Sequence, residues 1–158
     1  MATRKSKPRR RFVARGSGIH GKGVFATTHI PAGTRLIEYK GELLTEAQVD
    51  KRYANDDNPH TFLFALDHGM VIDATTDGNS ARWINHSCAP NCEAVDDDDR
   101  IYIETLRAIR PGEELSYNYR IELEEKHTPE MKRLYQCRCG ARRCKGTILH
   151  IKQKKKKR

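Results

Sequence analysis

The chain has 158 residues and a formal net charge of +9, from 30 Lys and Arg against 21 Asp and Glu. This length suits one domain with a buried core, and no apolar run approaches the roughly 20 residues that span a bilayer. A membrane-spanning protein is therefore excluded. Because residues 1–7 lack the apolar stretch of a secretory signal, we expect an intracellular protein, in the cytoplasm or in the nucleus or nucleoid.

The positive charge lies at the two ends of the chain. Residues 1–15 hold seven Lys or Arg and residues 152–158 hold six, with no acidic residue in either stretch. We expect basic arms at 1–11 and 151–158 to be disordered, because like charges repel and nothing there can be buried. Such arms attract nucleic acid weakly or serve solubility alone. The mildly acidic body between them suits a basic peptide better than DNA as the specific partner.

Short β-rich runs separated by turn residues dominate the body of the chain. Each run is bounded by Gly, Pro, Asn or Asp. The predicted strands are Phe12–Arg15, Val24–Ala26, Arg35–Tyr39, Thr61–Asp67, Met70–Asp73, Ile101–Thr105 and Glu114–Tyr117. The turn Asp67-His68-Gly69 predicts a tight hairpin, and the acidic run Asp96–Asp99 predicts an exposed hairpin tip.

Two short helices are predicted from their capping residues. Thr45 as N-cap, with Gln48 three residues later, forms a capping box for a helix over Glu46–Tyr53. Thr128, followed by a proline, opens a weaker helix over Pro129–Tyr135.

An internal echo is present in two turn-and-strand units. Ile30–Leu36 resembles Ile109–Leu115 in the placing of Ile, Gly and Leu. Each Gly permits positive φ in a turn that starts a strand ending in Tyr. Since no linker divides the body, we expect one domain of small β-sheets from about residue 12 to 150.

Five cysteines in an intracellular chain argue against a disulfide framework. Cys137, Cys139 and Cys144 form a tight cluster among basic residues, a setting that favours thiolates and a soft tetrahedral ion such as zinc. Three unconnected surface thiols are the alternative. Zinc needs a fourth ligand, and spacing does not choose between Cys88 and Cys92. Such a zinc would fold the C-terminal segment back over the loop at residue 88.

The segment Arg82–Asn91 packs amide, imidazole, hydroxyl and thiol groups into one short polar stretch. Its Asn, Ser and Pro residues predict a loop, because they disfavour both helix and strand. Apolar residues flank it on both sides, so we expect the loop to be tied down inside the fold. Loops of this kind commonly carry binding and catalytic residues.

In their order along the chain, these segments resemble the motifs of SET-domain protein lysine methyltransferases over residues 12–150. The matching segments are the Gly-rich His20–Val24, the Tyr-x-Gly motif Glu38–Glu42, the Asn-His-Ser-Cys signature Arg82–Asn91, the Glu-Leu-x-x-x-Tyr motif Gly112–Tyr119 and the post-SET zinc segment Cys137–Gly146. The sequence departs from the pattern at Trp83 (for Phe), Asn118 (for Asp) and Phe62 (for Tyr). No Cys-rich pre-SET segment precedes residue 12, so a single zinc is expected.

The resemblance implies a mostly β, β-clip-like fold of small curved sheets with a few short helices and a knot-like C-terminal threading. It implies a SET domain over residues 12–123 and a post-SET zinc-binding segment over 124–150, between the arms at 1–11 and 151–158. Cys88 is then the fourth zinc ligand, beside Cys137, Cys139 and Cys144. Cys92 is left as a core thiol.

The resemblance also implies that S-adenosylmethionine binds one face, joined by a narrow channel to the substrate lysine on the other. Glycines in the first motif let backbone approach the cofactor, while Asn85 and His86 offer hydrogen bonds. Arg82 pairs either with a cofactor carboxylate or with a loop carbonyl or Asp73. The implied cofactor-binding residues are His20, Gly21, Lys22, Gly23, Phe62, Arg82, Asn85 and His86.

Tyr39, Tyr117 and Tyr119 are the implied catalytic residues that line the channel. A dry channel beside the cationic cofactor disfavours the lysine ammonium, whose usual pKa is about 10.4, by desolvation and repulsion. Tyr119 stands at the position of the family's essential tyrosine. Tyr117 stands where the family alternates between Tyr and Phe, so its hydroxyl favours mono- or dimethylation unless it is only a core aromatic. We find no dedicated general base.

We therefore expect an S-adenosylmethionine-dependent lysine N-methyltransferase, monomeric and with one structural zinc. Its substrate is a histone, a histone-like or another basic protein, laid as an extended strand along a sheet edge. One alternative is a SET-fold binding module without turnover, against which the intact Tyr119, Asn85 and His86 weigh. Another is a nucleic-acid-associated zinc protein, against which the acidic body weighs.

Overall fold

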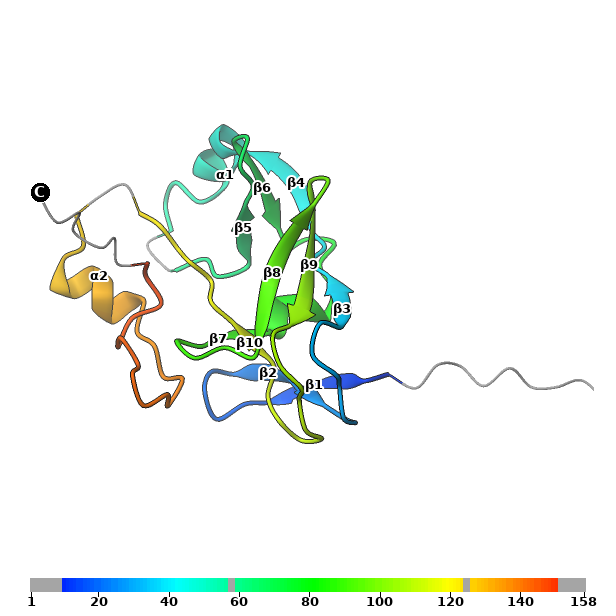
Figure 1. Ribbon diagram of the computed structural model, residues 1–158. Helices are drawn as coiled ribbons and strands as arrows, with labels where there is room; N and C mark the ends of the chain where they lie inside the picture. The colour runs from blue at the N-terminus through cyan, green and yellow to red at the C-terminus, as the bar shows by residue number, and fades with distance from the viewer. Residues whose placement is uncertain (1–9, 57–58, 124–125, 151–158) are drawn as a thin grey trace, which may run out of the picture.

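The computed structural model describes residues 10–56, 59–123 and 126–150. Small, mainly antiparallel sheets with a few short helices confirm the mostly β prediction (Figure 1). The elements, in chain order, are β1 (Phe12–Gly16), β2 (Lys22–Ala26), β3 (Arg35–Glu38), β4 (Glu42–Thr45), α1 (Glu46–Arg52), β5 (Leu63–Ala65), β6 (Met70–Asp73), the 3-10 helix η1 (Ser80–Trp83), β7 (Asn85–His86), β8 (Cys92–Asp97), β9 (Arg100–Thr105), β10 (Ser116–Tyr117) and α2 (Pro129–Leu134). None of the helices in these ranges is long and apolar enough to cross a bilayer.

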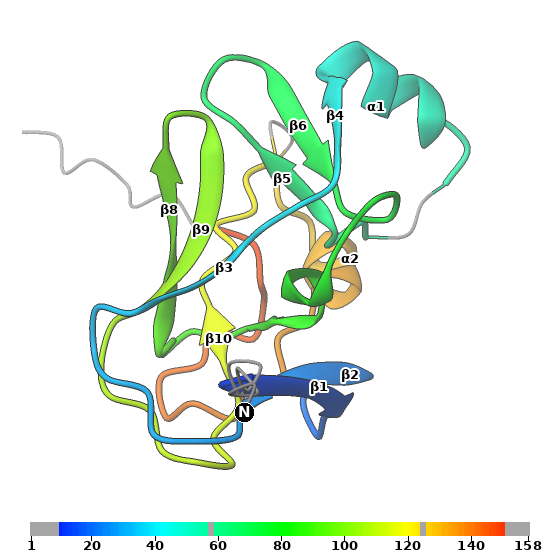
Figure 2. The same ribbon diagram turned by 90° about the vertical axis from the view of Figure 1, so that its right-hand side faces the viewer.

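The strands form four separate small sheets. Two are three-stranded and antiparallel, β3–β9–β8 and β4–β6–β5, and β1–β2 is an antiparallel pair. The fourth is the short parallel pair of β7 and β10, which are distant in sequence. In both views this pair lies between the β8–β9 hairpin and the β1–β2 pair (Figures 1 and 2).

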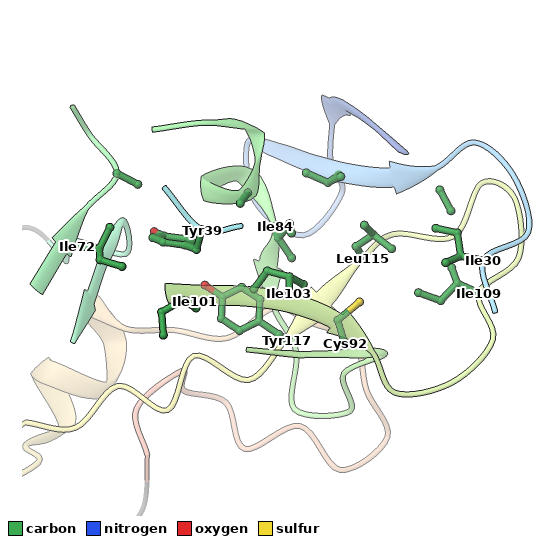
Figure 3. Close-up of a cluster of buried hydrophobic side chains, with 14 of the residues drawn as sticks. Ile30, Tyr39, Ile72, Ile84, Cys92, Ile101, Ile103, Ile109, Leu115 and Tyr117 are labelled. Atoms are coloured by element: carbon green, nitrogen blue, oxygen red, sulfur yellow. The ribbon is translucent and has the colours of Figure 1, made fainter. Parts of the chain in front are cut away.

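The core is built from aliphatic side chains of several sheets, and the two repeat units meet in it. Ile30 and Ile109 are fully buried and exchange backbone hydrogen bonds of 2.9 and 2.8 Å. Their turns contain Gly33 and Gly112 at φ of 73° and 83°, as the repeated Gly predicted. Figure 3 shows Ile30 and Ile109 at one end of this core, and Tyr39 at the other end. The two similar segments therefore pair with each other through the backbone of Ile30 and Ile109.

The predicted helices and hairpins are confirmed within one or two residues. Thr45 and Gln48 form the reciprocal capping box of α1, which ends at Arg52. Thr128 accepts the backbone N–H of Met131 at the start of α2. The two predicted hairpin turns connect β5 to β6 and β8 to β9.

Several strands are missed or shortened by sequence pattern alone. β4 and the acid-rich β8 were not predicted. In β8 the last two residues, Asp96 and Asp97, carry no apolar alternation. The predicted strand Thr61–Asp67 is reduced to Leu63–Ala65. The polar segment Arg82–Asn91 is not a loop throughout: it contains the end of η1 and all of β7. Partners distant in sequence supply the hydrogen bonds that its own residues do not.

Some expectations are not tested by this structure. The basic stretches 1–9 and 151–158 lie outside the described residues. The domain boundaries and the knot-like threading stay predictions.

Candidate functional site

Three tyrosines meet where β3, β10 and the segment after β10 approach each other. Tyr117 and Tyr119 have ring centroids 4.8 Å apart. The Tyr39 hydroxyl donates to the backbone oxygen of Phe62 at 2.8 Å, and the Tyr119 hydroxyl donates to the backbone oxygen of Ile84. Burial is the main cause that raises the pKa of each tyrosine. The pKa values of Tyr117 and Tyr119 are also affected by neighbouring tyrosines, and the pKa of Tyr39 is raised further by the charge of Asp73.

The three hydroxyls differ in the hydrogen-bonding capacity that remains for a ligand. A tyrosine hydroxyl has one proton to donate, and Tyr39 and Tyr119 each donate it to a carbonyl. Their oxygens therefore remain as acceptors only. Within the described residues the Tyr117 hydroxyl has no hydrogen-bond partner. Since each pKa is raised, all three stay protonated at neutral pH, and none is an anionic base.

The parallel pairing of β7 with β10 places the signature segment beside these tyrosines. Asn85 is opposite Ser116 and His86 is opposite Tyr117. Asn91, which is buried, fixes the pairing: its side-chain amide donates to the Glu114 backbone oxygen at 2.8 Å and accepts from the Ser116 N–H at 2.9 Å. Sequence reasoning assigned no role to Asn91, because its partners lie more than twenty residues away.

His86 connects the tyrosines to the cysteine cluster. Its Nδ1 accepts the backbone N–H of Tyr119 at 3.1 Å, and its Nε2 lies 3.7 Å from the Cys88 sulfur. Burial, with a smaller effect of Lys145, lowers the pKa of His86 to about 4, so the imidazole is neutral near pH 7. Both ring nitrogens face protein groups, and a cofactor-binding role for this residue stays a prediction.

The Gly-rich segment between β1 and β2 is tied to Asn85. The Asn85 amide nitrogen lies 3.0 Å from the Lys22 backbone oxygen and 3.3 Å from that of His20. Gly21 has φ of 40°, which a side chain would strain. Gly23 leaves space for a protein side chain, and its cofactor-binding role stays a prediction. A Cβ there would lie 2.2 Å from the Glu114 carboxylate, so this glycine makes room for a protein side chain.

Three further predicted residues gather around Trp83. Phe62 meets its ring edge-on at 5.3 Å, and Lys22 and Arg82 lie over it at 4.9 and 4.6 Å. Arg82 donates to the Ala74 backbone oxygen at 3.2 Å. The bond to a loop carbonyl is thus present, and pairing of Arg82 with a cofactor carboxylate stays a prediction.

The other alternative partner, Asp73, is fully buried and bonded elsewhere. Its carboxylate accepts from Tyr53 at 2.6 Å, Arg52 at 3.2 Å and the Thr75 N–H at 2.9 Å. The Arg82 Nε is buried with no hydrogen-bond partner among the described residues. Arg82 thus retains an unused donor beside the aromatic cluster.

The four predicted zinc ligands converge. The sulfurs of Cys88, Cys137, Cys139 and Cys144 all lie within 4.8 Å of one another. Cys88 is 3.8 Å from Cys137 and 4.0 Å from Cys144, close to the roughly 3.8 Å between sulfurs of a tetrahedral site with 2.3 Å zinc–sulfur bonds. Backbone N–H groups of Lys145 and Gly146 point at two of the sulfurs. The donor set and its geometry fit zinc.

Cys92 is excluded from this cluster. Its side chain is 0% exposed in the apolar core, and burial raises its pKa to about 12. The structure therefore places Cys88, and not Cys92, in the sulfur cluster, and it brings the C-terminal segment onto the loop at residue 88.

A hollow lies beside His86, between the signature segment and the C-terminal segment. Its walls combine polar groups with aliphatic side chains. The lining residues are His86, Cys88, Asn118, Lys145, Thr147, Ile148, Leu149 and His150.

Comparison with known proteins identifies the family. The SET domain model matches residues 21–120, and the chain belongs to the SET-domain family. Histone-lysine N-methyltransferase trithorax of Drosophila virilis is 42% identical over 135 residues, covering 82% of this chain and 3% of that protein. Human histone-lysine N-methyltransferase 2B is 39% identical, covering 82% of this chain and 5% of that protein.

A fungal relative extends this pattern. The protein named histone-lysine N-methyltransferase, H3 lysine-4 specific, from Emericella nidulans is 40% identical over 139 residues, covering 84% of this chain and 11% of that protein. The chain thus spans only a small part of the length of the curated relatives it matches.

Proposed function

We propose that this chain transfers methyl groups from S-adenosylmethionine to a lysine side chain of a histone or another basic protein. The observation that carries this proposal is the meeting of Tyr39, Tyr117 and Tyr119, with two hydroxyls left as acceptors beside the signature strand. The names of the relatives support it, since they are histone-lysine N-methyltransferases.

The neutral lysine amine is a donor of N–H groups and carries one reactive lone pair. In our proposal the oxygens of Tyr39 and Tyr119 accept its N–H groups, which fixes the direction of the lone pair. The surrounding burial disfavours the ammonium form. Because no tyrosine here is an anion, the amine loses its proton to water, and we assign no general base.

Bound S-adenosylmethionine supplies the electrophilic methyl group. We propose that the Gly-rich segment His20–Gly23 holds the cofactor together with Asn85 and His86. Phe62 offers a ring for stacking, and Arg82 offers its unused Nε–H.

The four clustered cysteines hold one structural zinc in this proposal, and the zinc fixes the C-terminal segment against the loop at Cys88. We expect a monomer that acts on an extended basic peptide. A chromatin-associated setting in the nucleus follows from the histone substrates in the relatives' names. The basic arms would add weak, salt-sensitive attraction to nucleic acid.

Incubation of the purified chain with labelled S-adenosylmethionine, histone H3 and a mixture of basic proteins tests the proposal. We expect label on lysine, identified by mass spectrometry. Cofactor binding without any transfer would instead indicate a SET-fold binding module. Steeply salt-dependent nucleic-acid binding that competes with the cofactor would indicate a nucleic-acid-associated zinc protein.

A further inference from the structure

Glu114 lies where the Gly-rich segment, β7 and β10 meet. Its carboxylate accepts the Ser17 hydroxyl, at 2.8 and 3.0 Å for the two oxygens, and the Asn85 amide at 2.9 Å. Backbone contacts place it there, since Glu114 pairs with Phe25 of β2 and the next residue donates to the Val24 oxygen at 2.7 Å. One side chain therefore joins three segments that are distant in sequence.

The charge of this carboxylate is not balanced by a neighbouring cation. Among the residues that the structure describes, no Lys or Arg forms an ion pair with Glu114, whose partners are the neutral Ser17 and Asn85. The side chain is half-buried, and a partly buried anion without a cation costs free energy. Its field reaches the channel: after burial and Tyr39, Glu114 is the next cause that raises the pKa of Tyr119.

The absence of a side chain at Gly23 leaves room for the Glu114 carboxylate. Gly23 lies in β2, and a Cβ on it would come within 2.2 Å of the Glu114 Oε1. Its φ lies outside the left-handed region, so alanine is compatible with the backbone there. A Cβ at this position would therefore displace the Glu114 carboxylate, and it would also lie 3.0 Å from the Ser17 Cβ.

We propose that Glu114 is a positioning residue, which holds the Ser17–Gly23 segment and the Asn85 amide in the arrangement that binds the cofactor. This inference rests on the proposed function. Asn85 would act on the cofactor, and Glu114 would act through Asn85 and the Gly-rich segment. Its uncompensated negative charge also favours a ligand that carries positive charge, as S-adenosylmethionine does.

Three measurements on Glu114→Ala test this role. They are the Kd for S-adenosylmethionine by calorimetry, the kcat together with the KM for S-adenosylmethionine, and amide hydrogen exchange of residues 17–23. Hydrogen bonds to a charged group are strong enough that we expect Kd and KM to rise about 10-fold or more, with kcat at saturating cofactor within about 3-fold. Exchange in residues 17–23 should become faster.

Matched variants separate positioning from general damage. Glu113→Gln is the control, because the neighbouring Glu113 pairs with Arg107 and not with the Gly-rich segment. It should leave Kd unchanged. Glu114→Gln keeps an oxygen for Ser17 and Asn85, so it should restore most of the affinity for the cofactor. The remaining difference in Kd from wild type then measures the contribution of the negative charge. If Glu114→Ala does not fold, the Kd of Glu114→Gln is compared with that of wild type instead.

A double-mutant cycle examines the contact with Gly23. Gly23→Ala should weaken cofactor binding mainly through its clash with Glu114, and the double variant with Glu114→Ala should lose less affinity than the sum of the two single losses. Additive losses would overturn the inference. So would an unchanged Kd in Glu114→Ala, or a fall in kcat without a change in KM.

Different results would contradict the methyltransferase function and the positioning role of Glu114. If the wild-type chain binds the cofactor and methylates nothing, the proposed function fails, while the Kd comparison still judges Glu114. If Glu114→Ala methylates with unchanged KM and Kd, Glu114 has no positioning role and the proposed function stands.

Discussion

The apolar core and the C-terminal cysteine segment (residues 137–146) are held by different forces. In the core, Ile30, Ile103 and Leu115 are fully buried and packed on residues from several sheets. In the cysteine segment, all of which the structure describes, only Cys137 is buried. Apolar packing therefore stabilises the core. The cysteine segment has little such packing and instead brings its sulfurs together. We infer that the second region depends on its metal and the first does not.

Cys88 and Cys92 express this difference within one short stretch. Cys88 points into the sulfur cluster, whereas Cys92 is enclosed by the core. The same residue type thus belongs to a potential metal site in one region and to the apolar core in the other. If the two regions are independent in this way, a change in one should leave the other intact.

The largest effect is expected for removal of a zinc ligand. Cys139→Ser should reduce bound zinc to near zero, measured by elemental analysis, and should lower methyl transfer by about 100-fold or more because the segment no longer orders. Cys92→Ala is the matched control and should keep its zinc. Amide exchange should rise in residues 137–146 while β3 and β9 stay protected; loss of protection in both would show that the regions are not separable.

Tyr119→Phe probes the point where the two regions touch, since Tyr119 also contacts His86. Loss of the acceptor oxygen should lower kcat by about 100-fold, within the range for a positioned polar group in catalysis. Stability should fall by only about 1 kcal/mol, the value of the lost hydrogen bond. The control is Tyr102→Phe on β9, outside the site. An equal loss of activity in both would contradict a specific role.

Ile109→Ala tests the core side of the comparison. Removing a fully buried aliphatic side chain should lower the free energy of unfolding by about 3 kcal/mol, measured by denaturant titration. The zinc content of the folded protein should not change. Leu106→Ala, at a residue 49% exposed, should change stability by less than about 0.5 kcal/mol. Release of zinc from folded Ile109→Ala protein would show that the core also maintains the cysteine cluster.

Asp73 adds a pH-dependent contribution to the core. Burial alone would raise its pKa, but hydrogen bonds from Tyr53, Thr75 and Arg52 outweigh burial, so its pKa is lowered. A carboxyl with a lowered folded pKa stabilises the protein above its unfolded pKa, and this contribution is lost as pH falls through the folded pKa. Asp73→Ala should therefore cost about 2 kcal/mol at pH 7. The difference from wild type should shrink below about pH 4; a constant difference would contradict the assignment.

Tyr117→Phe should have the smallest effect on rate and should change the product. Its hydroxyl has no protein partner among the described residues, so removing it leaves space without breaking a bond. We expect more highly methylated lysine by mass spectrometry, with stability changed by less than about 1 kcal/mol. An unchanged product distribution would mean that Tyr117 is only a core aromatic.

Local features of the chain were predictable because their causes are local. The capping box of Thr45 and Gln48, and the positive φ at Gly33 and Gly112, depend on residues within a few positions of each other. β8 was missed because its acidic end carries no apolar alternation, and it is a strand because β9 pairs with it.

In the candidate site, the sequence indicated the chemistry and left the partners open. It named the three tyrosines, Asn85, His86 and the cysteine triplet. Glu114 and Asn91 lie in the quoted motifs, but the sequence indicated no role for either and did not predict the contact of Gly23 with Glu114, since each acts on a residue more than twenty positions away.

The amino-acid sequence alone determined the mostly β character, the turns, the helix caps and the kinds of ligand available, because these follow from short-range sterics and from the chemistry of single side chains. Only the tertiary structure decided that Cys88 and not Cys92 joins the sulfur cluster, that Arg82 bonds to the Ala74 carbonyl, and that Glu114 fills the space beside Gly23. Those choices depend on which distant segments pack together, and that packing is a property of the whole core.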